Sequence, residues 1–555
     1  MAGDFAGPMR RTGGIIRVAT IPWVMTVVPI VAVTGRERGN VRMCRRRERR
    51  EGEALRRLPA ARPGRRWLRA AVMAAAVMIA TAGFAAVAAG AEGDLGAELD
   101  MAPPAAMPYA QPADAVVAEP TEPLALFPED ERFEAAIDKA VAARLAHRPP
   151  LYVPSTDFAP PKGLVLHATT HATSRYPFAL ALTGFIQGRW LELARSTTQW
   201  TNSAGETFPV NNENEFNLNR IYLAAQGYVG DERVVYNLAL FASTAPGVLV
   251  SVAPVGFVGY SVTEDVKLGM GVTQVPGSRE WLMSSQWPMG VDRSMVNTFM
   301  RPSYSPGFFS IGSLFDKRVL YEAGVWNGLD GGAAGVTRGG TAMAWAGNTW
   351  WEPLGPFGLG YSDMEHHAAP AFRLGMSGVT ARSPAYALPG LSGVANPENT
   401  VVRLSDGTPL AAPNALGPGT QVTAFNYQLA TADIGWKYRG WSAFAEYYWR
   451  LINGLTGTGS FDRSSLFDQG GNGFVGWCFV PRTYEIYGRS SALTGPYGSA
   501  HEVGGGLNWY MHRTRQNRLT LEALYIDGSP AQNPLYPYRA GFTGTVIQAQ
   551  YMVIF

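Results

Sequence analysis

The sequence predicts an all-β protein: a transmembrane antiparallel β-barrel of about 16 strands with a non-barrel N-terminal region. Three observations predict it. After about residue 160, apolar and polar residues alternate with the period of two that is typical of β-strands. The chain ends on a strand-like segment, TVIQAQYMVIF, whose last residue is Phe555. Short turn-like peptides alternate with long loops rich in Gly, Pro and Asn, which is typical of outer-membrane barrels.

The charge of the chain is concentrated near its N-terminus. The 555 residues carry a formal net charge of +3, but residues 1–91 hold 17 Arg and 5 acidic residues and so carry +12. Residues 92–150 carry −8, and the remainder carries −1. A large cationic face for nucleic acid is therefore not expected on the folded part of the chain.

Residues 65–91 have the pattern of a secretory signal peptide. A basic flank, RRWLR, precedes an apolar run and the small residues of a cleavage site, so cleavage is expected after Ala91. A permanent membrane helix is the alternative, but a run rich in alanine and glycine is only mildly apolar. Residues 1–64 form a basic extension, and we expect that translation starts later than Met1, with Met43 as a candidate. Of the two cysteines, only Cys478 then remains in the mature chain, which excludes a disulfide within one molecule.

Residues 92–160 are expected to form a periplasmic linker. This stretch is rich in Ala, Pro and acidic residues, and it contains one short helical pattern at 130–147. The apolar residues of that pattern recur every four positions: Phe133, Ile137, Val141 and Leu145. We interpret the helix as a capped connector; an oligomerisation or cell-wall contact is the alternative. The barrel is then expected to span residues 161–555.

The terminal strand shows the alternation most clearly. Its apolar face consists of Ile547, Ala549, Tyr551, Val553 and Phe555, and its polar face carries Gln548 and Gln550. The same alternation occurs at 234–240, 266–273, 430–437, 441–450 and 507–512. The second face repeatedly carries a charged residue, which indicates a wet interior rather than a packed core. Because lipid offers backbone groups no hydrogen-bond partner, such strands span a membrane only as a closed barrel.

The connections and the aromatic residues fit the same architecture. Short turns are expected at 230–233, 315–318, 353–358 and 438–440, and long loops at 379–421 and 453–472. Aromatic residues near strand ends fit interfacial girdles: Trp345, Trp350, Trp351, Tyr447, Tyr448 and Trp449. The last strand is expected to pair with a first strand near residues 180–195. A soluble all-β protein is the alternative, but it would have to bury too many apolar strand faces.

Several segments resemble the phosphate-selective porins of the O and P type. They are LGMGVTQVPGSREWLMSS (268–285), VDRSMVN (291–297), GVWNG (324–328), YRGWSAFAEYYWR (438–450), GFVGWCFVPRTYEIYGR (473–489), GGGLNWYMHR (504–513) and QAQYMVIF (548–555). The resemblance runs in register over about 180–555 and implies a 16-stranded trimeric channel in the bacterial outer membrane. Some members carry a lysine and arginine lining that favours phosphate. This chain departs from the pattern at Gln274, where many relatives have a lysine, so passage of anions or other small solutes is the expectation, with phosphate as one possibility.

A porin needs a hydrated path, a constriction and charges that select ions, and it needs no catalytic group or cofactor. Strand parity places Lys267, Lys437, Arg450 and Arg489 in the lumen, with Asp433, Glu446, Glu485 and Glu522 beside them. Arg189 and Arg220 are further candidates for pore-lining, anion-binding residues. The resemblance adds Arg293, with Asp292, on a loop that folds inward. For each of these residues, a structural ion pair across the lumen is the alternative.

The sequence gives less support to other functions. Ser499 and His501 are close in the chain, but nothing orients them as a catalytic pair, so no enzyme is expected. His366 and His367, with Asp363 and Glu365, lie on a polar connection and are expected to be solvated, so no metal site is predicted. A non-conducting surface scaffold or adhesin, with the long loops as its binding surface, is the alternative function. The expected partners are outer-membrane lipid, small anions or other small solutes, and two further copies of the chain in a homotrimer.

Overall fold

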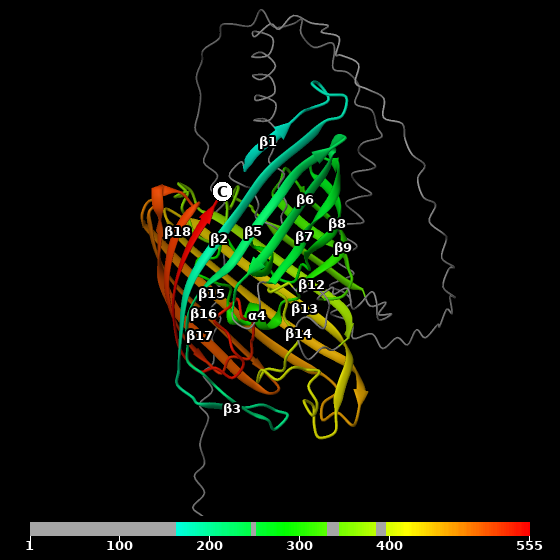
Figure 1. Cartoon of the computed structure of the whole chain (residues 1–555), viewed down its shortest axis with the longest axis vertical. Helices are drawn as coiled ribbons and strands as arrows, with labels where there is room; N and C mark the ends of the chain where they lie inside the picture. The colour runs from blue at the N-terminus through cyan, green and yellow to red at the C-terminus, as the bar shows by residue number, and fades with distance from the viewer. Residues whose placement is uncertain (1–162, 246–250, 330–342, 385–395) are drawn as a thin grey trace, which may run out of the picture. The chain divides into compact units, whose positions relative to one another are not determined.

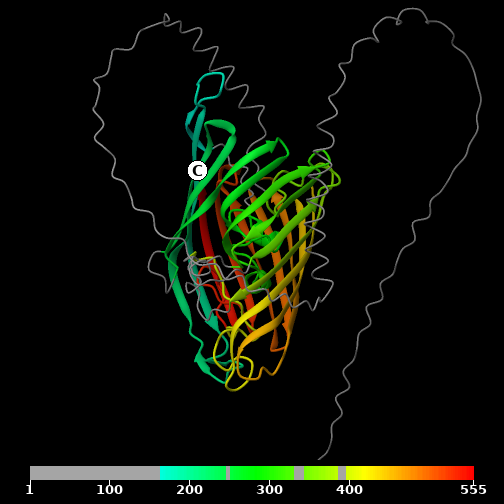
Figure 2. The same cartoon turned by 90° about the vertical axis from the view of Figure 1, so that its right-hand side faces the viewer.

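The described residues form a closed β-barrel (Figures 1 and 2). The structure, a computed structural model, describes residues 163–245, 251–329, 343–384 and 396–555. Sixteen strands pair antiparallel around the barrel, as the alternation predicted. The predicted N-terminal extension, signal peptide and linker with its helix at 130–147 lie outside the described residues.

The barrel strands follow one another in the order of the sequence, and the last pairs with the first. They are β2 (Phe178–Arg195), β5 (Glu213–Val229), β6 (Asp231–Ser243), β7 (Ser251–Thr263), β8 (Val266–Gln274), β9 (Tyr304–Leu314), β10 (Val319–Trp326), β11 (Ala344–Trp351), β12 (Ala371–Pro384), β13 (Gln421–Tyr438), β14 (Trp441–Thr458), β15 (Leu466–Val480), β16 (Tyr484–Gly495), β17 (Gly498–Tyr510), β18 (Asn517–Asp527) and β19 (Gly544–Ile554). Within the described ranges, three short strands lie outside this ring: β1 (Leu164–Ala168), β3 (Gln199–Thr201) and β4 (Thr207–Pro209). The short helices of the same ranges are α3 (Arg279–Leu282), α4 (Met295–Met300) and the 3₁₀ turn η1 (Met511–Arg513).

Pairing of β19 with β2 closes the ring, and the predicted first strand near residues 180–195 is confirmed. Ile554 lies opposite Phe185, and Gly544 lies opposite Arg195. Because β2 extends beyond the end of β19, its remaining edge would be left unpaired. β1 covers that edge, with Leu164 opposite Leu182. β1 thus pairs with the part of β2 that β19 does not reach, so that this edge of β2 is not left open.

The outer face of the barrel is apolar, and the inner face carries both polar and apolar side chains. On β19, Ile547 and Tyr551 point outward and are exposed, while Gln548 and Gln550 point inward and are buried. Other strands expose large apolar side chains in the same way: Leu238, Leu240, Val258, Met270, Phe308, Ile434, Val475, Ile486 and Leu521. Such a surface is costly in water and suits contact with lipid. Among the described residues, no helix has the length and apolarity needed to cross a membrane.

The connections differ from the predicted ones in several places. The predicted short turn at 353–358 is part of a longer connection, 352–370, whose segment 360–364 is buried. The predicted loops at 379–421 and 453–472 are shorter, because β12, β14 and β15 continue into them. The stretch 507–512 is a strand only as far as Tyr510, where η1 begins. In the loops and in connection 352–370, pairing with a neighbouring strand or packing against the interior overrides the local turn pattern. At 507–512 the strand pattern ends in a turn instead, and the turn predicted at 230–233 is limited to Gly230, because β6 begins at Asp231.

The interior is filled rather than open. Loop 275–303, which carries α3 and α4 and joins β8 to β9, lies inside the barrel, and all of its residues are buried (Figure 1). Most of segments 396–420 and 528–543 is buried as well. The predicted wet interior is therefore wrong: charged side chains do point inward, but they lie among buried apolar residues such as Phe185, Phe257 and Phe309 and contact the inserted segments. Trp350 and Tyr448, which were predicted to lie in an interfacial girdle, point inward and are buried.

Candidate functional site

Loop 275–303 is fixed to the barrel wall at the start of each of its helices. Glu446 on β14 accepts hydrogen bonds from the backbone N–H groups of Arg279, at 2.6 Å, and Glu280, at 3.0 Å. Glu502 on β17 accepts one from the N–H of Met295, at 3.0 Å. The first N–H groups of a helix have no partner within the helix, and they carry partial positive charge, so carboxylates at these positions stabilise the loop in its inward position.

A second set of contacts ties the two helices to each other. The carboxylate of Glu280 accepts hydrogen bonds from the N–H and the hydroxyl of Ser294, at 2.8 and 2.5 Å. It also accepts one from Asn472 of β15, at 2.6 Å. The hydroxyl of Ser294 in turn caps α4 by accepting from the N–H of Asn297. These bonds give the loop one defined conformation inside the barrel.

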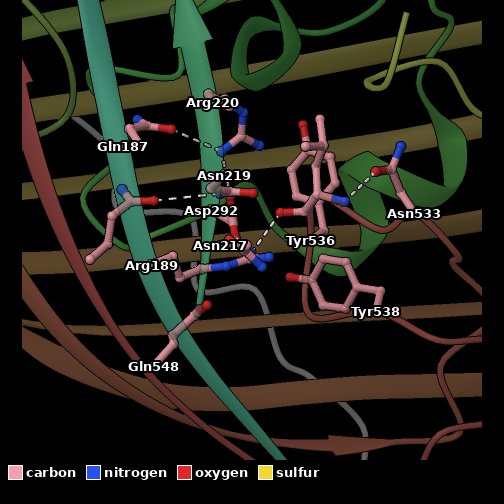
Figure 3. A network of polar contacts seen from close by, with 12 residues as sticks. Gln187, Arg189, Asn217, Asn219, Arg220, Asp292, Asn533, Tyr536, Tyr538 and Gln548 are labelled. Carbon is pink, nitrogen blue, oxygen red and sulfur yellow. Dashed lines mark hydrogen bonds and ion pairs between the residues drawn. The ribbon is translucent and has the colours of Figure 1, made fainter. Parts of the chain in front are cut away.

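The loop presents Asp292 to two arginines of the wall (Figure 3). The Nη1 atom of Arg189, on β2, lies 3.0 Å from Asp292 Oδ2, and the Nη1 atom of Arg220, on β5, lies 2.8 Å from Asp292 Oδ1. Arg220 also donates to Gln187, at 3.2 Å. All four side chains are buried, so these charge-assisted bonds form away from water, where they are strong.

A second carboxylate, that of Glu398, completes this arginine cluster. Its Oε1 atom lies 2.7 Å from Arg220 Nε and 3.3 Å from Arg293 Nη1. Arg293 also donates to the hydroxyl of Tyr536, at 2.8 Å. Arg301 donates to the backbone carbonyl of Glu398, at 2.6 Å, and its guanidinium lies over the ring of Trp281. We use "arginine cluster" for Arg189, Arg220, Arg293 and Arg301 with Asp292 and Glu398.

Arg489 of β16 continues the cluster along the barrel wall. It donates to the backbone carbonyls of Asp292, at 2.7 Å, and Arg293, at 3.1 Å. Its guanidinium also pairs with Glu502, at 3.0 Å, and Glu522, at 3.3 Å. Arg489 therefore holds the turn that carries Asp292 and Arg293. Four of the seven predicted site residues thus come together: Arg189, Arg220, Arg293 and Arg489.

The other three predicted residues lie apart from this group. Arg450 pairs with Asp468, at 2.8 Å, and donates to the carbonyl of Phe299 at the end of loop 275–303. Lys437 donates to the carbonyl of Leu359 in connection 352–370, at 3.1 Å. Lys267 is only partly buried and lies at the start of β8, near the end of the barrel that carries the short turns. Arg450 and Lys437 hold inserted segments to the wall.

The cluster contains residues that the sequence analysis missed. Glu398, Tyr536 and Arg301 lie in connections without periodicity, and they reach the cluster only through the fold. Arg373 of β12 and Arg518 of β18 also point inward and are buried, and the alternation of their strands was a signal that could have found them. Asp433, predicted to be in the lumen, lies 3.9 Å from Arg373.

Two cavities adjoin the cluster. The first is lined in part by Phe299, Arg301 and Arg450. The second is lined in part by Ser285, Arg293 and Tyr304. The cluster thus places guanidinium donors next to two pockets, and guanidinium groups bind carboxylate and phosphate oxygens well.

The alternative chemistries find little support in the described residues. Ser499 donates to Thr494, and His501 lies beside Asp527, at 3.7 Å; both residues are exposed on β17. Donor atoms of Asp363, Glu365 and His367 lie within 4.8 Å of one another, although Asp363 is buried and not solvated as predicted. Each already has a protein partner: His367 binds Asp363, at 2.5 Å, and Arg515 binds Glu365, at 2.8 Å.

Comparisons with known proteins give structural neighbours only. No family model matches the chain, and no curated protein matches it. A structure of OmpT of Vibrio cholerae matches with 11% sequence identity and a TM-score of 0.43, covering 70% of this chain and 100% of that chain. An anion-selective porin from Comamonas acidovorans matches with 10% identity and a TM-score of 0.41, covering 68% and 100%. OprB of Pseudomonas putida matches with 9% identity and a TM-score of 0.41, covering 68% and 94%. We therefore describe the fold of this chain from its own strand pairing and not from these neighbours.

Proposed function

We propose that the chain is a porin of the bacterial outer membrane that lets small solutes, and anions in particular, diffuse through its barrel. One observation carries the proposal: a closed ring of 16 strands has an apolar outer face and encloses a buried cluster of arginines. A barrel of this size has room for an aqueous path. Lipid is the solvent that such an outer face suits.

The charge of the arginine cluster supports the preference for anions. The cluster holds four guanidinium groups and two carboxylates, those of Asp292 and Glu398, a net charge of +2; with the adjoining Arg489, Glu502 and Glu522 the net charge is +1. A positive constriction lowers the energy of an entering anion and raises that of a cation. We also propose a homotrimer, because the sequence resemblance implies one, and export through the periplasm, because residues 65–91 have the pattern of a signal peptide. Phosphate remains one of the anions that the channel would pass.

The filled interior favours one alternative, a barrel that does not conduct and serves as a surface scaffold or adhesin. Loop 275–303 and segments 396–420 and 528–543 occupy the space that an open channel would need. In a porin, some of these contacts must open during passage. In a scaffold, all of them would persist.

Single-channel recording decides between the two functions. The refolded protein is added to a planar lipid bilayer in KCl, with heat-denatured protein as the control. The porin proposal predicts discrete current steps that appear only with the folded protein. A folded, membrane-inserted protein that gives no current steps would establish the scaffold alternative.

A further inference from the structure

Glu398 is the one member of the arginine cluster that reaches it on segment 396–420. Its carboxylate lies 2.7 Å from Arg220 Nε, and both of its oxygens lie 3.3 Å from Arg293 Nη1. Every hydrogen bond described for this carboxylate comes from arginine. The side chain is 1% exposed, and its two partners are 178 and 105 residues away in the sequence.

The backbone around Glu398 is held by short polar contacts. Asn396 Oδ1 accepts from the N–H of Glu398, at 2.9 Å, and Arg301 donates to its carbonyl, at 2.6 Å. Asn533 Nδ2 donates to the carbonyls of Pro397 and Asn399, at 3.2 and 3.4 Å. Except for the bond within the turn, these partners belong to loop 275–303 and to segment 528–543. Glu398 is therefore presented to the arginines from the loop side rather than by a barrel strand.

Asp292, the other carboxylate of the cluster, is placed differently. It lies on loop 275–303, which is tied to the wall through Glu446 and Glu502 and to Arg489 through its backbone carbonyl. Asp292 thus belongs to the fixed part of the cluster. Glu398 lies on a different segment and is joined to that loop through Arg293 and through the bond from Arg301 to its backbone carbonyl.

The electrostatics keep Glu398 ionised in this position. Burial alone would raise the pKa of its carboxyl, but Arg293, Arg220 and Arg301 lower it to about 2. If Glu398 left, four guanidinium groups would face the single carboxylate of Asp292. A net charge of +3 in a buried site is costly unless another anion enters.

Neighbours of Glu398 line two pockets. Arg301, which binds its carbonyl, lines the first pocket, and Arg293, which binds its carboxylate, lines the second. Thr400 and Val401, which follow Glu398 in the chain, line the first pocket.

We infer that Glu398 is a tethered ligand of an anion site formed by Arg220 and Arg293, and that this site takes the carboxylate of a small organic anion when Glu398 withdraws. The inference rests on the proposed function and adds a ligand class and a means of control to it. In the structure, the carboxylate of Glu398 occupies the site between Arg220 and Arg293, and the proposed ligand carries the same group. A permeating carboxylate replaces it and keeps the arginines neutralised.

The test compares the wild-type protein with Glu398→Gln in planar bilayers, with succinate as the probe. Glutamine has nearly the same shape but no charge, so it competes poorly for the arginines. We expect Glu398→Gln to raise the chloride conductance by about threefold or more. If Glu398 occupies the site nine-tenths of the time, succinate should block the variant at about one-tenth of the concentration that blocks the wild type. Glu213→Gln, which removes a carboxylate paired with Arg539 outside the cluster, should behave as the wild type.

Several results would overturn the inference. One is an unchanged conductance and succinate sensitivity in a folded Glu398→Gln protein; another is stronger block by phosphate than by succinate at equal concentration. If Glu398→Gln fails to fold, Glu398→Asp keeps the charge but shortens the reach, and it should show an intermediate succinate sensitivity; wild-type sensitivity would contradict the inference.

A measurement without current separates the two proposals. Isothermal titration of succinate into the detergent-solubilised proteins should show tighter binding to Glu398→Gln than to the wild type. Such binding in a protein that never conducts would refute the porin function and leave the anion site standing. Conduction with equal succinate binding in both proteins would support the porin function and refute the anion site.

Discussion

Gly184 and Phe555 exchange two backbone hydrogen bonds: the N–H group of each residue donates to the carbonyl of the other, at 2.9 Å. These bonds join the last residue of the chain to the strand that begins the barrel. The Thr183 hydroxyl donates to the same Phe555 carbonyl, at 3.1 Å. The C-terminal residue therefore takes part in closing the ring, since an open sheet edge in lipid would leave backbone groups without partners.

Gly184→Val should weaken this closure. A Cβ atom at position 184 would lie 2.5 Å from the Tyr222 carbonyl oxygen and 2.9 Å from the Phe555 ring, so the side chains and strands must shift. We expect a loss of about 1–3 kcal/mol in the free energy of unfolding. Urea unfolding of the refolded protein in micelles measures it. Gly378→Val is the matched control, because no atom lies within 4 Å of a Cβ there. Equal stability of the two variants would argue against a role for the Gly184–Phe555 contact.

Leu238→Arg tests whether the outer face contacts lipid. Leu238 lies in the middle of β6 and is 57% exposed, so in water an arginine would be harmless there. In lipid, it should cost about 2–4 kcal/mol if it lies near the bilayer midplane. The comparison is Leu354→Arg, in the exposed part of connection 352–370, which should be neutral. Unfolding from lipid vesicles gives both values, and a neutral Leu238→Arg would contradict a membrane-facing surface.

Asp292→Asn should destabilise the cluster. The change leaves Arg189 and Arg220 buried without the charge of their shared partner. Removing one partner of a buried ion pair costs about 3–5 kcal/mol, so the protein should unfold at clearly lower urea concentration. Asp231→Asn removes an exposed partner of Arg233 and should leave the midpoint unchanged. Equal midpoints for Asp292→Asn and the wild type would show that the loop does not depend on this pair.

The pairing of Glu398 has a predictable pH dependence. Its pKa is lowered from 4.5 to about 2, so the carboxylate stabilises the folded state fully above pH 4.5, and this contribution is lost as the pH falls through about 2. The difference in unfolding free energy between the wild type and Glu398→Gln should stay constant from pH 7 to pH 5. Below that it should shrink by about 3 kcal/mol as the pH approaches 2. Loss of the whole difference between pH 7 and pH 5 would mean that the arginines do not hold this carboxylate ionised.

The barrel was predictable because its signal is local. Alternation at Gln548 and Gln550 indicates which face points inward, and the length of the alternating region predicts about 16 strands. The same parity placed Arg450 and Arg489 on the inner face. Strand ends were less predictable, because β13 and β14 continue for 18 residues each through Asn, Gly and Thr that also favour loops. Pairing with a neighbouring strand decides such cases, and a sequence window does not contain the neighbour.

The filling of the barrel was not predictable from local pattern. Connection 352–370 has the Pro and Gly residues of a tight turn, yet Tyr361 enters the barrel and stacks on Phe444, with ring centroids 4.0 Å apart. Glu398 lies in a segment without periodicity, and its arginine partners come from β5 and from loop 275–303. Glu446 was predicted to face the lumen, and Glu502 was missed. The role of both residues at the helix starts of loop 275–303 depends on contacts between distant segments.

The arginine cluster is proposed to lie on the path of permeating anions. The reversal potential under a KCl gradient tests this most directly, measured for the wild type and for Arg220→Gln, with Arg233→Gln, in a pair at the start of β6, as the control. The account predicts an anion-directed reversal potential for the wild type and the control, and a shift toward cations for Arg220→Gln. A cation-directed wild type, or a potential that Arg220→Gln leaves unchanged, would contradict it.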